Sequence, residues 1–220
     1  MIEKGISFGN IHSYRNLNLI LSGSQIPPAK PKTTYVEIPG GDGSVDLTEA
    51  NGEVKYSDRE CKFTFTMNPM GDLSEAAWEA KKTEVSNALN GLEFRITLDK
   101  DDRFYYLGRC EVSEYLSDRR IRQIVVTAKV KPYKFKQNVT IAKFELSSTE
   151  KTIYLRNGRK SVSPVIECSN DNTMIEFGNA SYSLDAGSHK ILEIRFVEGI
   201  NQMNISGTGT VTFMYQEGEL

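Results

Sequence analysis

Side chains that commonly carry out chemistry are few in this sequence and lie far apart. The chain has two histidines, His12 and His189, and three cysteines, Cys61, Cys110 and Cys168, without Cys-x-x-Cys spacing. A structural zinc site needs four such ligands together, and a nucleophilic triad needs a histidine beside its nucleophile. We expect the histidines to lie in different domains, which leaves too little material for either site. Each cysteine lies in a strand-like run, so we expect buried, reduced thiols.

Two short loops match ligand-binding loops only in part. Gly40-Gly41-Asp42-Gly43 lacks the spacing and the lysine of a phosphate loop, and no helix is predicted after it. Asp99-Lys100-Asp101-Asp102 lacks the glycine and the terminal glutamate of an EF-hand loop, which favours a solvated turn. Carboxylate pairs such as Asp99 with Glu111 leave glycoside hydrolysis open, because any 29 acidic residues include such pairs. The sequence therefore predicts no catalytic residue, no metal site and no cofactor.

Charge and hydropathy exclude several classes of protein. Lysine and arginine total 27 against 29 acidic residues, a net charge of −2, and neither half of the chain is basic. Binding to nucleic acid normally requires a basic excess, so no nucleic-acid specificity is expected. No apolar run reaches 18 residues, so we expect no membrane insertion, and the first ten residues lack a signal-peptide core.

The elements that must position any site begin with the stretch from Tyr35 to Thr66. Residues 35–38 are β-branched and aromatic and predict a strand, which Pro39 and the glycines after it end. Val45 and Leu47 follow in a segment that is punctuated by glycine up to residue 52. Residues 61–67 then alternate apolar and polar, which predicts a strand with one buried face.

One helix is predicted, from about Leu73 to Asn90. Asp72 and Glu75 have capping-box spacing, with Ser74 as a competing cap, and Gly91 suits the position after the helix. Its apolar stripe contains Trp78, Val85 and Leu89, and packing of this stripe on a sheet must stabilise the helix.

Strands predominate in the rest of the chain. Segments 92–98, 104–116 and 121–130 predict two successive hairpins, and Pro132 closes this unit. Eight short strands then follow, at about 139–145, 151–156, 162–168, 173–177, 180–184, 189–196, 200–205 and 209–215. This pattern predicts a two-sheet sandwich. We therefore expect a mainly β protein with domains at residues 1–134 and 135–220.

Several ordered motifs carry a resemblance to a known family. They are Ile38–Thr48 with Val54, Tyr56, Asp58 and Arg59; Leu89-Asn90-Gly91 with Arg95–Asp99; Tyr105–Arg109; and Lys131-Pro132-Tyr133-Lys134. In this order they resemble the distal tail protein of siphophages and prophages that infect Gram-positive bacteria. Family members often have a basic residue where Gly41 stands, which weakens any charge-dependent role inferred for this loop.

The resemblance implies a β-rich, tail-tube-like first domain with one helix, and a galectin-like or carbohydrate-module-like β-sandwich as the second domain. It implies a structural protein, not an enzyme, that forms a ring, typically a hexamer, at the tail tip of the virion. The implied partners are the major tail tube protein, a tail-associated lysin or tail fibre protein, and receptor-binding proteins. Synthesis would occur in the host cytoplasm, with release by lysis.

The candidate subunit contacts lie in two loops of the first domain. They are Gly40, Gly41, Asp42, Gly43, Val45, Leu47, Arg119 and Arg120; a solvated turn is the alternative for the two arginines. Tyr154, Tyr182 and Tyr215 are candidates for stacking on sugars, with packing in the second domain as the alternative. Two rival functions therefore stay open: a carbohydrate-binding protein that recognises host cell-surface glycans, and an enzyme that acts on the cell wall.

Overall fold

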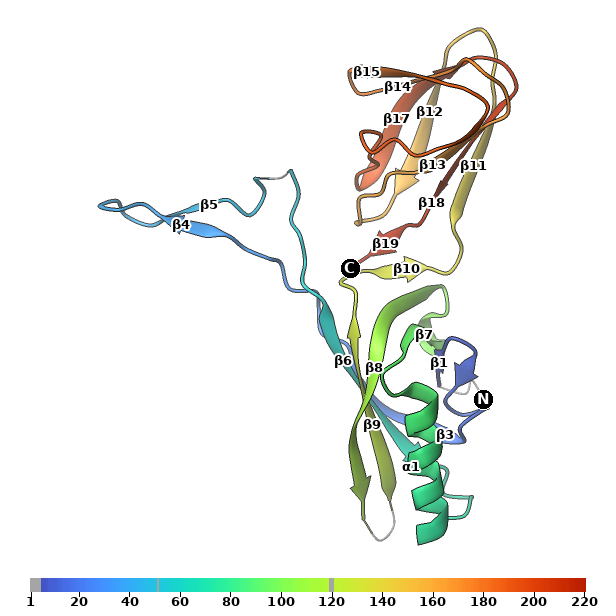
Figure 1. The fold of residues 1–220 in the computed structure, drawn as a ribbon. Coiled ribbons are helices and arrows are strands. Elements are labelled where there is room, and N and C mark those ends of the chain that lie inside the picture. The colour runs from blue at the N-terminus through green and yellow to red at the C-terminus, as the bar shows by residue number, and fades with distance from the viewer. Residues whose placement is uncertain (1–4, 51, 119–120) are drawn as a thin grey trace. The chain divides into compact units, whose positions relative to one another are not determined.

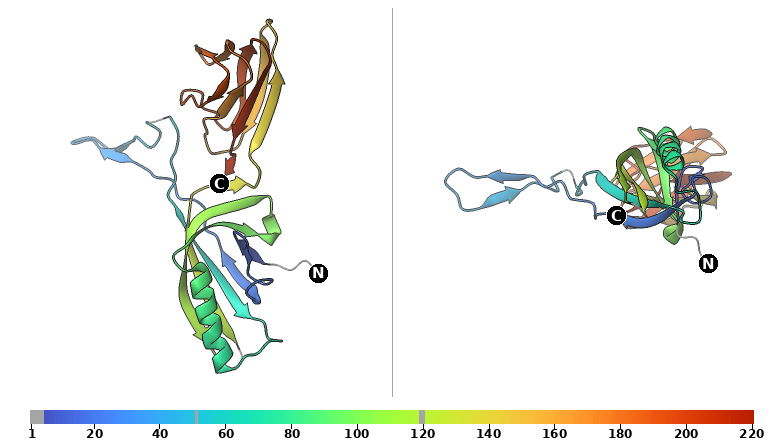
Figure 2. Two further views of the ribbon diagram at one scale, coloured as in Figure 1. Left: turned by 45° about the vertical axis from the view of Figure 1, so that its right-hand side comes forward. Right: turned by 90° about the horizontal axis from the view of Figure 1, so that it is seen from below.

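The computed structural model describes residues 5–50, 52–118 and 121–220. The chain divides into two compact units, unit 1 (Met1–Lys134) and unit 2 (Phe135–Leu220). Figures 1 and 2 show the elements of each unit. Both units consist mainly of antiparallel β-strands, which confirms the predicted mainly β fold class.

One antiparallel sheet forms the framework of unit 1. Its described strands follow the order β2-β1-β7-β8-β9-β6-β3. They are β1 (Ile6–Phe8), β2 (Ile11–His12), β3 (Leu19–Gln25), β6 (Arg59–Met67), β7 (Glu93–Leu98), β8 (Phe104–Ser117) and β9 (Arg122–Val130). The 3₁₀ turn η1 (Asp99–Asp101) connects β7 to β8. Both predicted hairpins are therefore present.

Alternation along the strands separates a buried inner face from a polar outer face. In β6, the side chains of Cys61, Phe63, Phe65 and Met67 are buried, as the sequence predicted. They form one core with residues from every neighbouring strand and with the helix. Because side chains on a strand point alternately to its two sides, the residues between them lie on the opposite, outer face.

Helix α1 (Glu75–Leu89) covers the inner face of the sheet. Its N-cap is Ser74, whose hydroxyl accepts a hydrogen bond from the Ala77 N–H at 3.2 Å. Asp72 instead accepts a hydrogen bond from the Ser74 N–H. Ser74, the competing candidate, is therefore the N-cap, and the predicted capping box of Asp72 with Glu75 is wrong. The helix buries Trp78, Val85 and Leu89, as its apolar stripe predicted.

A long connection between the adjacent strands β3 and β6 contains a separate hairpin. Its strands are β4 (Tyr35–Glu37) and β5 (Ser44–Asp46), which pair antiparallel with each other. In Figures 1 and 2, this hairpin stands away from the sheet of unit 1. We call residues 26–58 the arm and its β4–β5 end the arm hairpin.

Unit 2 is a sandwich of two four-stranded antiparallel sheets. The described strands follow the orders β11-β18-β13-β16 and β12-β17-β14-β15. Their bounds are β11 (Thr140–Glu145), β12 (Lys151–Asn157), β13 (Val165–Cys168), β14 (Thr173–Phe177), β15 (Ala180–Leu184), β16 (Gly187–His189), β17 (Gly199–Ser206) and β18 (Thr210–Tyr215). Two short strands, β10 (Lys134–Lys136) and β19 (Gly218–Glu219), pair with each other. The predicted two-sheet architecture is present.

One predicted strand of unit 2 is wrong. Residues 190–198 follow an irregular path, and only Phe196 forms an isolated bridge, to Val162. Ile194 and Phe196 are buried and gave the segment its strand-like alternation. Side-chain amides replace a strand partner here, because Asn201 bonds both the N–H and the C=O of Val197, and Asn157 donates to the Phe196 carbonyl.

Candidate subunit interface

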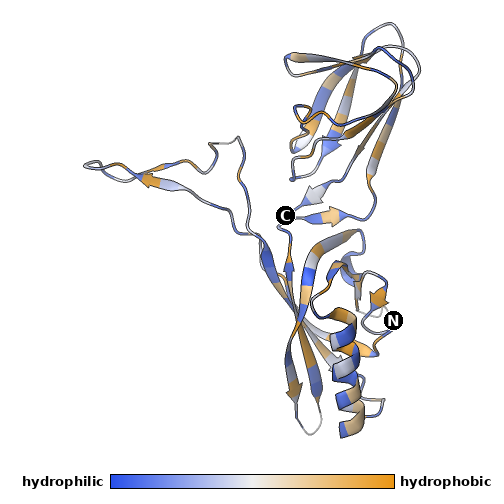
Figure 3. Ribbon diagram, viewed as in Figure 1, coloured by the Kyte–Doolittle hydropathy of each residue, from blue (hydrophilic) through white to orange (hydrophobic). Residues whose placement is uncertain are grey.

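The arm hairpin has one apolar face. In its register Val36 lies opposite Val45, and Leu47 donates its N–H to the carbonyl of Thr34. The pairing is therefore regular, and the side chains of paired residues in β4 and β5 point to the same face. Residues an even number apart share a face, which places Val36, Ile38, Val45 and Leu47 on the same side. Each of these four side chains is between 43% and 51% exposed. Figure 3 marks apolar residues along this hairpin, which no core of unit 1 includes.

The opposite face and the turn of the hairpin are mainly polar and acidic, although the exposed ring of Tyr35 also lies on this face, opposite Asp46. Glu37 and Ser44 are paired on this face, and Asp46 lies beside them in β5. Hydrogen bonds from Thr48 hold the pKa of the Asp46 carboxyl below its usual value. The hairpin is therefore amphipathic, although each of its strands is only three residues long. An isolated two-stranded hairpin of this size is marginally stable in water, so a partner surface should order it.

The predicted glycine segment forms the end of this hairpin. Gly40 and Gly43 both have a positive φ angle of 77°. Residues other than glycine adopt this backbone conformation only at an energetic cost. Gly41 and Asp42 lie between them and are exposed. The predicted pair Val45 and Leu47 lies on the apolar face. Sequence reasoning missed Val36 and Ile38, which could have been found only from the hairpin register.

Motifs that suggested the family resemblance meet at the base of the arm. The guanidinium of Arg59 is buried, donates from Nε to the Pro132 carbonyl at 2.8 Å, and lies over the ring of Tyr106. Tyr56, near the end of the arm, packs edge-on against Tyr133 with 5.9 Å between ring centroids. Burial raises the pKa of the Tyr106 hydroxyl. These contacts fix the C-terminal end of the arm to β8 and to the residues that follow β9.

The other predicted contact residues, Arg119 and Arg120, lie outside the described residues. Their neighbour Arg122 donates to Glu75 at 3.0 Å and lies over the ring of Trp78. Arg122 therefore stabilises the start of the helix.

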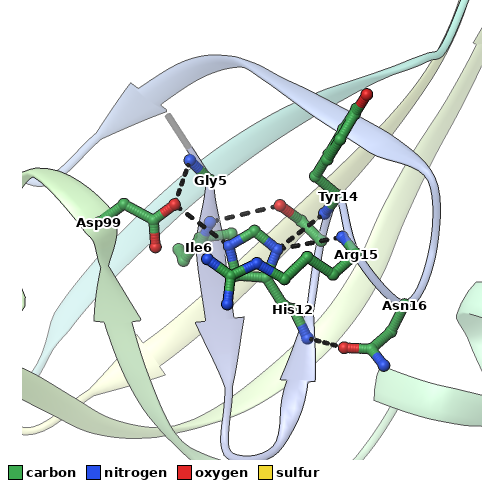
Figure 4. Close-up of polar contacts among 8 residues, drawn as sticks. Gly5, Ile6, His12, Tyr14, Arg15, Asn16 and Asp99 are labelled. Carbon is green, nitrogen blue, oxygen red and sulfur yellow. Dashed lines mark hydrogen bonds and ion pairs between the residues drawn. The ribbon is translucent and has the colours of Figure 1, made fainter. Parts of the chain in front are cut away.

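His12 and Asp99 form the most enzyme-like cluster of the chain, which Figure 4 shows. His12 is buried, and its Nε2 lies 3.1 Å from Asp99 Oδ2. Its Nδ1 accepts hydrogen bonds from the backbone N–H groups of Tyr14 and Arg15, which places the ring hydrogen on Nε2. Asp99 also accepts from the Gly5 N–H at 2.8 Å. Since a general base needs a free lone pair, this histidine serves as a clamp between η1 and the segment after β2.

Asp99 and Glu111 do not share a site. The carboxylate of Asp99 binds His12 and Gly5, whereas Glu111 lines a hollow on the outer face of the sheet that Asp99 does not line. No cluster of three or more metal-ligating His, Cys, Asp or Glu side chains occurs within the described ranges. The three cysteines are free and buried, as predicted, and burial raises the pKa of all three thiols.

The three candidate sugar-stacking tyrosines are not brought together. Tyr215 is buried in the core of unit 2, its ring lies 5.1 Å from that of Phe196, and its hydroxyl donates to the Arg156 carbonyl. It has no free ring face, so the assignment of Tyr215 to a sugar site is wrong. Tyr182 is half-buried against the same core. Tyr154 is 63% exposed on the outer face of β12 and is the one that could stack on a ligand.

The fold is that of a distal tail hub protein of phages. The chain is similar along nearly its whole length to the SPP1 Dit (gp19.1) protein, whose structure is described as a paradigm of the hub adsorption apparatus in phages that infect Gram-positive bacteria. The match has a TM-score of 0.70 and 12% sequence identity, and it covers 97% of this chain and 98% of that chain. No protein-family model matches this chain, and no curated protein sequence matches it. The resemblance that short motifs indicated is therefore confirmed in the fold.

Within the part of the chain that the structure describes, no helix is long and apolar enough to cross a membrane.

Proposed function

We propose that this protein is the ring-forming hub at the tip of a phage tail, where it connects the tail tube to the host-adhesion apparatus. The observation that carries this proposal is the uncovered apolar face of the arm hairpin, in a chain with the fold of a phage hub protein. Val36, Ile38, Val45 and Leu47 would be buried against a neighbouring subunit. The protein acts by assembly and needs no catalytic group.

Burial of this apolar face would supply part of the energy that association needs. Full burial of a valine, leucine or isoleucine side chain contributes about 1.5–3 kcal/mol, and about half of each side chain is still exposed. Four such side chains would contribute roughly 3–6 kcal/mol. The rest of the interface must bring the total buried area above about 1,000 Å² for a specific contact.

The contact is of the head-to-tail type, because the arm of one subunit meets a different surface on the next. Such contacts close into a ring or grow into a filament. The family resemblance favours a closed ring of six, located in the virion tail tip. The partners on its two sides would be the major tail tube protein and a tail-associated lysin or tail fibre protein, and unit 2 would hold receptor-binding proteins. The units at residues 1–134 and 135–220 would be separate folding domains.

Light scattering over a concentration series, with class averages from electron micrographs, tests this proposal. We expect closed rings from the wild-type protein. Val45→Asp with Leu47→Asp should abolish them and leave unit 2 folded. Ser44→Asp adds one negative charge next to Val45 but on the acidic face, and it should assemble like the wild type, whereas Val45→Asp alone, with the same added charge, should weaken assembly. Equal assembly by the apolar-face variant and the wild type would show that the arm hairpin is not the contact.

A carbohydrate-binding role for unit 2 is the second candidate. It is favoured by Tyr154, whose exposed ring lies beside Gln202 on the outer face of its sheet. A glycan array probed with residues 135–220 tests this role. Specific binding that Tyr154→Ala abolishes would support it, whereas an array without signal would exclude the glycans tested.

A further inference from the structure

One end of the sandwich in unit 2 contains a hollow of about 480 Å³, which we call the end hollow. It lies where β11 begins at Thr140 and β12 ends at Asn157, and the segment after β18 adds Glu217 and Glu219 to its wall. Lys136 of β10 also lines it, and all of its lining residues belong to unit 2. Sites for small ligands usually measure about 300–1,000 Å³, so the end hollow has a suitable size.

A buried carboxylate in this wall is only half satisfied. The side chain of Glu217 is 8% exposed. Its Oε1 accepts hydrogen bonds from Lys136 Nζ at 2.6 Å and from the Thr140 hydroxyl at 2.5 Å. Its Oε2 accepts none from the described residues, although each carboxylate oxygen can accept two. Because a charge that is removed from water is costly without a full set of partners, this oxygen calls for a donor from the end hollow.

A buried amide oxygen in the same wall also has no partner. Asn157 is 2% exposed and lies on the inner side of β12, as does Leu155, and both line the end hollow. Its Nδ2 donates to the carbonyls of Lys160 and Phe196, at 2.9 and 3.2 Å, which fixes the orientation of the amide group. Its Oδ1 is buried and accepts no hydrogen bond from the residues that the structure describes. Buried side-chain polar atoms nearly always have a partner, so this oxygen is a second unfilled acceptor.

Glu219 supplies a third acceptor. A Cβ atom at Gly158 would lie 2.6 Å from Glu219 Oε1, so the absence of a side chain at Gly158 makes room for this carboxylate. In the described part of the chain, Glu219 forms no ion pair and no side-chain hydrogen bond. The end hollow therefore presents several oxygen atoms that can accept hydrogen bonds and that no protein group fills.

The charges around the end hollow favour a neutral ligand. Lys136 and Arg156 would repel a cation, and Glu217 and Glu219 would repel an anion. Glu198, the other acidic residue of the lining, is paired with an arginine outside the hollow at 2.5 Å. A hydroxyl group is neutral, donates one hydrogen bond and accepts two, so a molecule with several hydroxyls matches both kinds of partner. The ammonium group of Lys136 has further N–H groups to donate besides the one that Glu217 accepts.

We propose that the end hollow binds a neutral sugar ring. Hydroxyl groups of the sugar would donate to Glu217 Oε2, to Glu219 and, directly or through one ordered water, to Asn157 Oδ1, while Lys136 would donate to a sugar oxygen. This inference rests on the carbohydrate-binding role offered above for unit 2, and it gives that role a site that Tyr154 does not line. A single ring offers few atoms for contact, so we expect a dissociation constant on the order of 1 mM.

Calorimetric titration of the full chain tests this site. The sugars are glucose, galactose, rhamnose, N-acetylglucosamine and N-acetylgalactosamine, and at least one of them should bind. Glu219→Ala removes an acceptor that no protein group uses, so it keeps the fold and should weaken binding about 10-fold. Glu217→Gln keeps the size of the side chain and should have a similar effect. Glu145→Ala removes an exposed carboxylate elsewhere in unit 2 and should bind like the wild type.

Other outcomes would overturn the assignment. In NMR spectra of the labelled protein, the side-chain amide of Asn157 should shift when the sugar binds. Binding that Tyr154→Ala abolishes and Glu219→Ala leaves unchanged would overturn the end hollow and leave the carbohydrate role on the outer face of β12. Binding of spermidine, calcium or phosphate in place of sugars would overturn the neutral ligand. No heat from any of the sugars up to about 50 mM would overturn the sugar site and leave the hub function untouched.

Discussion

Replacing Trp78 by alanine should remove a large part of the stability of unit 1. The side chain is 2% exposed, belongs to the core under the sheet, and packs edge-on against Tyr115 at 6.1 Å. Lys82 and Arg122 lie over its ring, each 5.7 Å from the centroid. The substitution therefore removes an apolar contact, an aromatic pair and two cation–π contacts at one position.

The expected loss follows from the buried area. A buried tryptophan removes roughly 150–250 Å² from water, which at about 25 cal/mol per Å² corresponds to ~4–6 kcal/mol. Alanine retains a small part of this, and the cavity relaxes only partly, so we expect a loss of about 3–5 kcal/mol. Domains are stable by only ~5–15 kcal/mol. The melting temperature of unit 1 should fall by roughly 10–20 °C.

Calorimetry and urea unfolding followed by circular dichroism measure this loss. Trp78 is the sole tryptophan of the chain, so tryptophan fluorescence reports on unit 1 in the wild type. The variant has no tryptophan, so its unfolding must be followed by calorimetry and circular dichroism. The transition of unit 2 serves as an internal reference and should not move. Met70→Ala, at a side chain that is 96% exposed in the same unit, should change stability by less than about 0.5 kcal/mol. Equal unfolding midpoints for Trp78→Ala and wild type would refute the assignment of this residue to the core.

Three further outcomes are expected. Limited proteolysis should release fragments near residues 1–134 and 135–220, and cooperative unfolding of the whole chain without a stable fragment would argue against separate domains. Burial raises the pKa of Cys61 to about 11 and of Cys110 to about 12, so both thiols should resist a thiol reagent at pH 8 in the native protein and react in urea; fast native reaction would contradict their burial. Loss of the helix cap in Ser74→Ala should cost about 1 kcal/mol by urea unfolding, and an unchanged midpoint would show that the cap is dispensable.

Patterns of local sequence predicted the elements that local physics determines. The alternation of residues 61–67 fixed the buried face of β6, and the single apolar stripe of the helix fixed Trp78 as a core residue. Alternation was misleading at residues 190–196, because asparagine side chains 157 and 201 bind that backbone from elsewhere in the fold. Such partners cannot be found from the segment itself.

The candidate site was only partly predictable for the same reason. Val45 and Leu47 stood out as apolar residues in a glycine-rich segment. Their alignment with Val36 depends on a cross-strand register that is set by the turn. The burial of Tyr215 likewise follows from the face that β18 turns inward, which a list of tyrosines does not reveal.

The position of the arm in the chain determines how unit 1 would carry a mechanical load. Both ends of the arm continue into neighbouring strands, β3 and β6, so a pull along the arm draws these two strands in the same direction. The tension then reaches the ladder between β6 and β9, which extends from Arg59 opposite Val130 to Thr66 opposite Gln123. The hydrogen bonds of an antiparallel pair lie perpendicular to the strands. When β6 is pulled lengthwise past β9, all of these bonds are therefore loaded at the same time and do not open one after another. Force spectroscopy with handles at Gly41 and at Gln123, at the far end of this ladder, should show a single high rupture force; a series of small steps would indicate peeling. In an assembled tail tip, a neighbouring subunit that holds the arm would therefore load the sheet of unit 1 along its strands, which is the direction in which the sheet is stiffest.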